Sequence, residues 1–252
     1  MIKVLDIDLD FFLDNIMHMP QNDQRLSPRA FKPWTRTKVR AFLETQCGLS
    51  RSLKIPGRFI RNHDAAFDYW RELLANHPTS FPIHVTHVDA HADLGLGDAS
   101  WVHLMTSVLH KPVGERPNAE RGAHKLSLGS YLAYAVACRW VGHIDYVHPE
   151  GGGDDMAPWL FRDFTAKSGV IEMRAFSPID IKRGELSSGM KKHLMSLTPV
   201  SIEPPVNFHS VQHNIWKAGH TFDYALLCQS PQYTPRTSDN LISVFTDYIN
   251  FV

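Results

Sequence analysis

The chain contains 252 residues, 43% of them hydrophobic, which supplies enough apolar side chain for one sizeable core. Its 26 Lys and Arg residues balance 26 Asp and Glu residues, so no broad basic surface is available for nucleic acid or for an anionic membrane. Three widely spaced cysteines argue against a disulfide framework, and no apolar run approaches the roughly 18 residues of a membrane span. We therefore expect one domain over residues 1–252 in a reducing, cytoplasmic setting, with no nucleic-acid or membrane partner and with an oligomeric state that stays open.

Apolar runs and helical periodicities alternate along the chain. Strands are predicted at 2–9, at the start of 81–94, and at 144–148, 169–176, 205–210 and 222–230. Helices are predicted at 37–47, 63–77, 129–140 and 238–251. Outside its helix, the segment 20–60 is predicted to be loop-rich and basic, and 149–158 is predicted to be a glycine-rich loop. Strands that alternate with helices favour an α/β fold with a mostly parallel sheet.

Three acids stand at alternate positions of the first predicted strand, in "DIDLD". In an extended chain the side chains of Asp6, Asp8 and Asp10 point the same way. Two carboxylates about 4 Å apart repel each other by roughly 4 kcal/mol at an effective dielectric constant near 20. Protonation of some of the acids, or one or two divalent cations, must offset this repulsion.

A second dense group of polar side chains follows the strand that begins at residue 81, in "HVDAHADLG". Asp89 and His91 alternate to one side, and a turn can bring Asp93 to the same point. Because loops converge at the carboxyl ends of parallel strands, we expect both acidic motifs in one site. Oxygen ligands with a minority of imidazole suit manganese or another borderline-hard divalent ion. Two such ions could lower the pKa of a bridging water from about 15.7 toward neutrality and so supply a hydroxide nucleophile.

These residues carry a family resemblance. "HVDAHADLG" resembles the D-A-H-x-D signature of arginases, agmatinases and the wider ureohydrolase superfamily, and "LDIDLDFF" resembles that superfamily's later D-x-D motif. The resemblance implies a three-layer αβα arginase/deacetylase-like fold with a central, mostly parallel sheet and a cluster of two Mn²⁺ ions. It also implies a further histidine at the start of an upstream helix, and His63 in "RNHDAAFDYWREL" matches that position.

The resemblance assigns a role to each ligand. Asp89 would bridge both ions, His63 and Asp93 would hold one ion, and His91 would hold the other. Asp93 would also accept a hydrogen bond from the bridging hydroxide. The D-x-D pair would close the cluster, with Asp8 and Asp10 as ligands and Asp6 behind them, or with Asp6 and Asp8 in the alternative register.

The likeness is closest to peptide arginases, which convert arginine side chains of ribosomally made precursor peptides to ornithine and release urea. "LGSYLAYAVACRW", "IDYVHP" and "CQSPQYTP" are further features similar to this group. The implied activity is a cytoplasmic peptide modification in ribosomal natural-product biosynthesis, with a precursor peptide as partner. Free arginine or another small guanidine, a one-ion deacetylase-like amidohydrolase, and a non-catalytic binding module remain the alternatives.

Two departures from the family pattern affect these expectations. The D-x-D motif comes first in this chain, whereas it follows the D-A-H-x-D block in ordinary arginases, so we hypothesise a permuted strand order that keeps the same central place in the sheet. The family's E-x-N-P segment, whose glutamate binds the guanidinium, is replaced by Cys228, Gln229, Ser230 and Pro231. Another acid must then bind a cationic substrate, and Glu150, Asp154 and Asp155 are the candidates. We expect His103 to carry a proton to the leaving amine, with His110 and His148 as its competitors.

Overall fold

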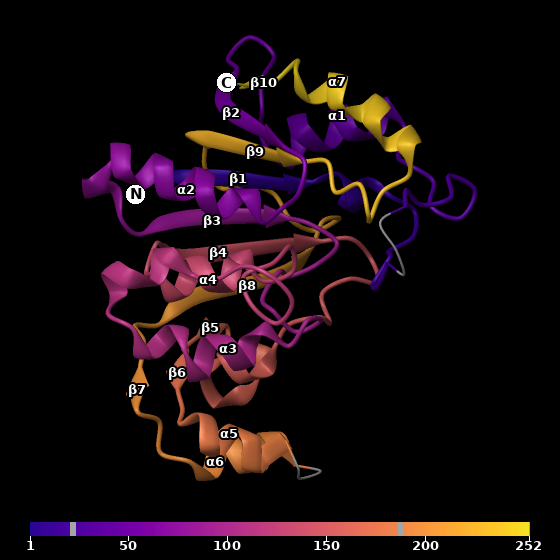
Figure 1. The fold of residues 1–252 in the computed structure, drawn as a ribbon. Helices are drawn as coiled ribbons and strands as arrows, with labels where there is room; N and C mark the ends of the chain where they lie inside the picture. Colours follow the sequence, from indigo (N-terminus) through magenta and orange to yellow (C-terminus); the bar gives the residue numbers. More distant parts are fainter. Residues whose placement is uncertain (21–23, 186–188, 252) are drawn as a thin grey trace.

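A computed structural model describes residues 1–20, 24–185 and 189–251. It contains an eight-stranded sheet in the order β10-β2-β9-β1-β3-β4-β8-β5 (Figure 1). Neighbouring strands are parallel, except that β5 runs antiparallel to β8. In sheet order the strands are β10 (Ile249–Phe251), β2 (Ile55–Ile60), β9 (Tyr224–Cys228), β1 (Lys3–Asp8), β3 (Ile83–Val88), β4 (Val141–His148), β8 (Val206–Gln212) and β5 (Val170–Ile171). A separate antiparallel pair consists of β6 (Arg174–Ala175) and β7 (Ser201–Ile202).

Helices flank this sheet and complete the predicted three-layer α/β fold. The α-helices are α1 (Arg36–Thr45), α2 (Ala65–Asn76), α3 (Ser100–Thr106), α4 (Tyr131–Ala137), α5 (Pro178–Glu185), α6 (Met190–Ser196) and α7 (Ile242–Phe245). The 3₁₀ helices are η1 (Leu9–Phe12), η2 (Pro78–Ser80), η3 (Val108–His110), η4 (Val113–Asn118), η5 (Pro158–Leu160), η6 (Arg162–Phe164), η7 (Ala166–Ser168) and η8 (Arg236–Leu241). In Figure 1, α2, α4 and α3 lie in front of the sheet. Among the described residues, no helix combines the length and apolar composition that a membrane crossing needs.

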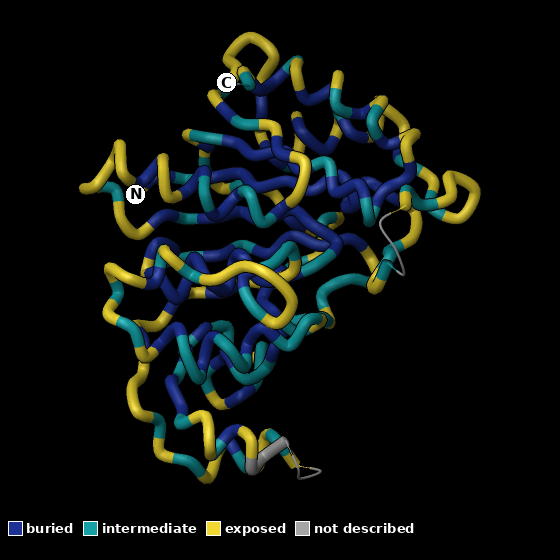
Figure 2. The backbone as a smooth tube through the Cα atoms, viewed as in Figure 1, coloured by how far each residue is buried: buried dark blue, intermediate teal, exposed yellow. Residues whose placement is uncertain are grey.

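The sheet separates two apolar cores, because successive strand residues point to opposite faces. Val4 of β1 and Val85 of β3 belong to the front core, with Trp70 of α2 and the whole apolar surface of α4. Leu5 belongs to the back core, which includes residues of α1 and α7. Figure 2 shows the buried strands between the more exposed outer segments. Burying both faces explains why the central strands are nearly continuous apolar runs.

Several features of the fold differ from the sequence predictions. The predicted strand 169–176 is divided into β5 and β6. The chain leaves the main sheet at Glu172, whose amide donates to the carbonyl oxygen of Leu160 (2.9 Å) instead of to a strand. The predicted helix 238–251 ends at Phe245, and its last residues form β10 beside β2. The strand β2 was not predicted, because it lies in the segment 20–60 that was predicted to be loop-rich. Residues 21–23 of that segment are outside the described part of the chain.

The sequence of β2, "IPGRFI", does not indicate a strand, because proline and glycine are unfavourable inside strands. Gly57 nevertheless fits its position, since a Cβ atom on it would lie 2.5 Å from the carbonyl oxygen of Ala225 on β9. The close approach of two backbones therefore requires the glycine. The short helices α3, α5 and α6 were also not predicted.

Candidate metal centre

The two acidic motifs meet at the carboxyl ends of neighbouring strands. β1 pairs with β3 in parallel, with Ile7 opposite Val88, so the residues that follow each strand emerge side by side. Asp8 caps the short helix η1 by accepting a hydrogen bond from the Asp10 amide (3.0 Å). The Ala90 amide in turn donates to Asp10 Oδ1 (3.4 Å). "DIDLD" thus lies directly beside "HVDAHADLG", and this adjacency is what the permuted-strand hypothesis requires.

The first group of ligand atoms surrounds one nitrogen of His63. This residue follows β2 and begins the turn into α2, and it is buried. Its Nδ1 atom lies 3.1 Å from Asp8 Oδ2, 3.0 Å from Asp89 Oδ2 and 3.2 Å from Asp93 Oδ2. Although Nδ1 is buried and close to these three carboxylates, it makes no hydrogen bond to any of them. A buried ring nitrogen that lies close to three carboxylates and has no hydrogen-bond partner suits a metal ion.

A second group of ligand atoms lies on the other side of Asp89. His91 Nδ1 is 3.0 Å from Asp10 Oδ2 and 3.7 Å from Asp89 Oδ1. Asp89 therefore turns one oxygen toward the His63 group and the other toward the His91 group. Its Oδ1 atom is also fixed by the amide of His91 (2.7 Å). One carboxylate that faces two groups of ligand atoms has the arrangement of a bridge between two ions.

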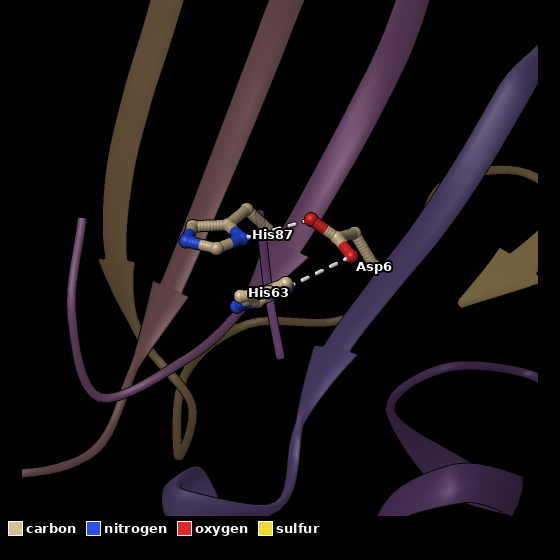
Figure 3. A group of neighbouring side chains, drawn as sticks. All are labelled: Asp6, His63 and His87. Atoms are coloured by element: carbon tan, nitrogen blue, oxygen red, sulfur yellow. Dashed lines mark hydrogen bonds and ion pairs between the residues drawn. The ribbon is translucent and has the colours of Figure 1, made fainter. Parts of the chain in front are cut away.

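Asp6 contacts the rings of both His63 and His87 and so orients the first group (Figure 3). His63 Nε2 lies 3.1 Å from Asp6 Oδ1, and the Tyr131 hydroxyl donates to Asp6 Oδ2 (2.6 Å). His87 Nδ1 is 3.2 Å from the same Asp6 oxygen. When Nε2 of His63 carries the proton that Asp6 accepts, Nδ1 is left with its lone pair toward the acids. The structure thus brings Asp8 and Asp10 to the two groups of ligand atoms and places Asp6 on the other side of His63.

His91 is oriented in the same way by a main-chain group. Its Nε2 atom lies 2.9 Å from the carbonyl oxygen of Met17, which can only accept a hydrogen bond. The proton of the neutral ring therefore belongs on Nε2, and Nδ1 presents a lone pair to Asp10 and Asp89. With Nε2 protonated in both rings, His63 and His91 could each offer Nδ1 to a metal ion; in the structure His91 Nδ1 is within hydrogen-bond distance of Asp10 Oδ2 (3.0 Å).

The carboxyl groups of the cluster shift one another's pKa values. Burial raises the pKa of Asp10, and the neighbouring carboxylates of Asp8 and Asp89 raise it further. Burial and Asp89 likewise raise the pKa of Asp93 to about 7. Burial also opposes ionisation of Asp89, but the rings of His63 and His91 outweigh it and lower its pKa. Without cations, some of these carboxyl groups must keep their protons, because acids this close cannot all ionise.

Backbone strain accompanies the ligands. Asp93 has φ = 49° and Ser230 has φ = 44°, both in the left-handed region that few residues other than glycine adopt. The Ser230 hydroxyl donates a short hydrogen bond to Asp8 Oδ2. Such conformations cost roughly 1–3 kcal/mol each and persist where the surroundings hold them in place. The fold therefore holds these two side chains against the acids at an energetic cost.

A cavity of about 490 Å³ opens over the cluster. Beyond the ligand atoms it is lined by two more acids, Asp98 and Asp155, and by His18, Gln232 and Tyr233. Among the described residues, none of those that line it is a lysine or an arginine. The cavity is therefore acidic, with room for a small ligand or a side chain of a larger one.

The other predicted site residues lie elsewhere. His103 of α3 is half-buried, with its ring stacked over Tyr134 at 6.5 Å between centroids, and it does not line the cavity. In the glycine-rich loop, Glu150 and Asp154 are exposed, whereas Asp155 lines the cavity. His110 donates to the main-chain carbonyl of Phe176 and His148 to that of Pro149, and neither lines the cavity.

Three residues of the site were missed by sequence reasoning. His87 precedes Asp89 by two positions on the same strand, so alternation alone could have placed it on the face of the ligands. His18 and Asp98 lie in irregular segments beyond the motifs and carried no comparable signal.

No protein-family model, curated protein or solved structure matches the chain. Buried groups of aspartate and histidine that could hold metal ions are present, and two of them are the His63, Asp89, Asp93 group and the Asp10, Asp89, His91 group. The unpaired Nδ1 of His63 and the surplus of acids both fit divalent cations.

Proposed function

We propose that this protein is a binuclear manganese hydrolase that converts arginine side chains of a precursor peptide to ornithine and releases urea. The observation that carries the proposal is the position of Asp89, whose two oxygens face two separate ligand groups at the base of an acidic cavity. The resemblance of "HVDAHADLG" and "LDIDLDFF" to ureohydrolase motifs supports the same reading.

The ligand sets assign one position to each ion. Asp8, His63, Asp89 and Asp93 would hold the first ion, and Asp10, Asp89 and His91 would hold the second. Carboxylates outnumber imidazoles in both sets, which favours manganese over metals that prefer nitrogen or sulfur. When bound, the two ions would lower the pKa of a water held between them and so supply a hydroxide nucleophile at neutral pH.

Charge favours a cationic substrate. Two divalent cations would neutralise the four ligand carboxylates, and Asp98 and Asp155 would then remain as uncompensated acids of the cavity. Asp155 Oδ2 accepts a hydrogen bond from the Ala92 amide (2.9 Å), whereas its buried Oδ1 has no partner. Burial raises the pKa of Asp155, and a guanidinium beside it would stabilise the ionised form. We assign Asp155 the guanidinium-binding role for which the sequence also offered Glu150 and Asp154.

Two side chains have the positions to move protons. Asp93 lies among the ligands of the first ion, where its carboxylate can accept a hydrogen bond from the nucleophile and aim it at the guanidinium carbon. His18 lines the cavity, with its ring 6.2 Å from that of His91 between centroids. Because His18 lines the cavity and His103 does not, His18 is the better placed of the two to deliver a proton to the leaving ornithine amine.

A peptide assay tests this function. Manganese-loaded protein is incubated with arginine-containing peptides and with free arginine, and the products are followed by mass spectrometry and by a urea assay. We expect urea together with the mass loss of arginine-to-ornithine conversion, and we expect Asp89→Asn to abolish both. Asp163→Asn is a matched control, because Asp163 is exposed and its positive φ is tolerated by asparagine.

The outcomes separate the alternatives. Turnover of free arginine without turnover of peptides would restrict the activity to small guanidines. Release of acetate from acetylated amines by protein with one bound ion would support the deacetylase-like alternative instead. No product from any of these substrates, with manganese bound, would overturn the proposal.

A further inference from the structure

A second group of possible ligands lies on the opposite face of the sheet. His84 of β3 shares its face with Val88, which packs in the back core, whereas His87 and Asp89 are on the front face. His143 and Asp145 of β4 lie beside His84, since His84 is the register partner of His143. These residues come early in their strands, at the end of the sheet away from the candidate metal centre.

The ligand atoms of this group converge on one carboxylate. His84 Nε2 lies 2.7 Å from Asp145 Oδ2, and His143 Nε2 lies 3.2 Å from Asp145 Oδ1. The two rings are 4.1 Å apart between centroids. Donor atoms that share one tetrahedral ion at about 2.0–2.1 Å are separated by about 3.3 Å, so small side-chain rotations would bring these three atoms onto a common ion.

A third imidazole comes from the connection between β8 and β9. The ring of His220 lies 4.7 Å from that of His84 between centroids. Its Nε2 atom is buried and has no hydrogen-bond partner. A buried nitrogen without a partner beside the His84 ring is not explained by the hydrogen bonds that His84 and His143 make to Asp145. His209 of β8 approaches the rim of the group, with Nδ1 3.5 Å from Asp145 Oδ1.

We propose that His84, His143, Asp145 and His220 form a structural zinc site. Imidazole nitrogens with one carboxylate are a zinc ligand set, in contrast to the oxygen-rich candidate centre on the other face. The His84 and Asp145 side chains are 13% and 15% exposed, so an ion can enter from solvent. The ion would tie β3 and β4 to the connection that covers them, which makes its effect one on stability rather than on turnover.

Metal binding in a background without the candidate centre tests this site. In Asp89→Asn, which lacks the carboxylate that faces both ligand groups there, we expect one bound Zn²⁺ per chain by elemental analysis and a higher melting temperature with Zn²⁺ than with a chelator. Adding His84→Ala and His143→Ala to that background should remove both effects. His77→Ala is the control, because His77 is exposed and belongs to no ligand group in the described part of the chain.

If the variant with His84→Ala and His143→Ala does not fold, X-ray absorption of zinc-loaded Asp89→Asn still tests the proposed zinc site, because its four ligands are unchanged in that variant. We expect the scattering of several imidazole rings around the ion. Zinc without imidazole neighbours, absence of zinc binding, or equal loss of zinc in His77→Ala would each overturn the proposal. Since the readouts are metal content, coordination and melting, a failed peptide assay would leave this site unaffected.

Discussion

The Nε2 atom of His63 lies 3.1 Å from Asp6 Oδ1, and this contact turns the opposite nitrogen of the ring toward three carboxylates. Burial alone would raise the pKa of Asp6, but His63 and His87 outweigh it and lower the pKa below its ordinary value. Asp6 therefore remains an ionised hydrogen-bond acceptor at neutral pH. A carboxylate behind a ligating histidine fixes the tautomer and increases the basicity of the ligand.

Replacing Asp6 by asparagine should weaken metal binding without removing a ligand. The amide can still accept one hydrogen bond, but it lacks the charge that makes His63 a stronger base. We expect affinity for manganese to fall about 10- to 100-fold, with the ion count unchanged at saturation. Calorimetric titration measures this. An affinity equal to that of the Asp163→Asn control would show that Asp6 does not support the centre.

Asp89 and Asp10 should differ in their effect on metal content. Asp89 faces both ligand groups, whereas Asp10 faces only the group of His91. We therefore expect Asp89→Asn to lose both manganese ions and Asp10→Asn to lose mainly one. Elemental analysis after manganese loading distinguishes them. If both variants lost the same number of ions, the assignment of Asp89 as the shared ligand would be wrong.

Asp155 should determine affinity for the substrate more than the rate of the reaction. A hydrogen bond to a charged group contributes about 1.5–3 kcal/mol, so Asp155→Asn should raise KM for an arginine peptide by roughly tenfold or more. We expect kcat to change much less. Steady-state kinetics with Glu150→Gln as the matched control separates the two acids, because Glu150 is exposed and outside the cavity. An unchanged KM in Asp155→Asn would exclude this role.

Glu203 should make the stability of the fold depend on pH. It is buried, and Arg116 and Arg139 donate to its two oxygens at 2.8 Å. Burial opposes its ionisation, but the two arginines outweigh burial and hold the pKa of Glu203 below its ordinary value of 4.5. The stabilisation is therefore present above about pH 4.5 and is lost as the pH falls through the lower pKa of the folded state.

The variant Glu203→Gln leaves the buried Arg116 without its carboxylate. We expect the free energy of unfolding to fall by about 3 kcal/mol at pH 7. Urea unfolding at pH 7 and at acidic pH should show that the difference between variant and wild type narrows in acid. A difference that is independent of pH would contradict the charge-based explanation.

The sequence predicted the candidate ligands better than it predicted the rest of the cavity. Asp8, His63 and Asp89 stand in local motifs, so strand alternation and the ends of parallel strands suffice to bring them together. The position of Asp98 in the cavity wall depends on a turn in which Ala99 has φ = 54°, and no pattern in the sequence predicts that conformation.

The same contrast applies to the fold. The apolar runs of β1 and β3 predicted two central strands, whereas β2 and β10 exist through tertiary pairing that overrides local preference. Gly57 weakens a strand in isolation, yet its lack of a side chain is what permits the pairing with β9. Long-range packing of this kind cannot be read from local sequence.

Crystals grown with manganese and measured at the manganese absorption edge test the central claim most directly. We predict two anomalous peaks, one among Asp8, His63 and Asp93 and the other between Asp10 and His91, with Asp89 in contact with both. A single peak, or manganese bound away from Asp89, would contradict the two-ion centre.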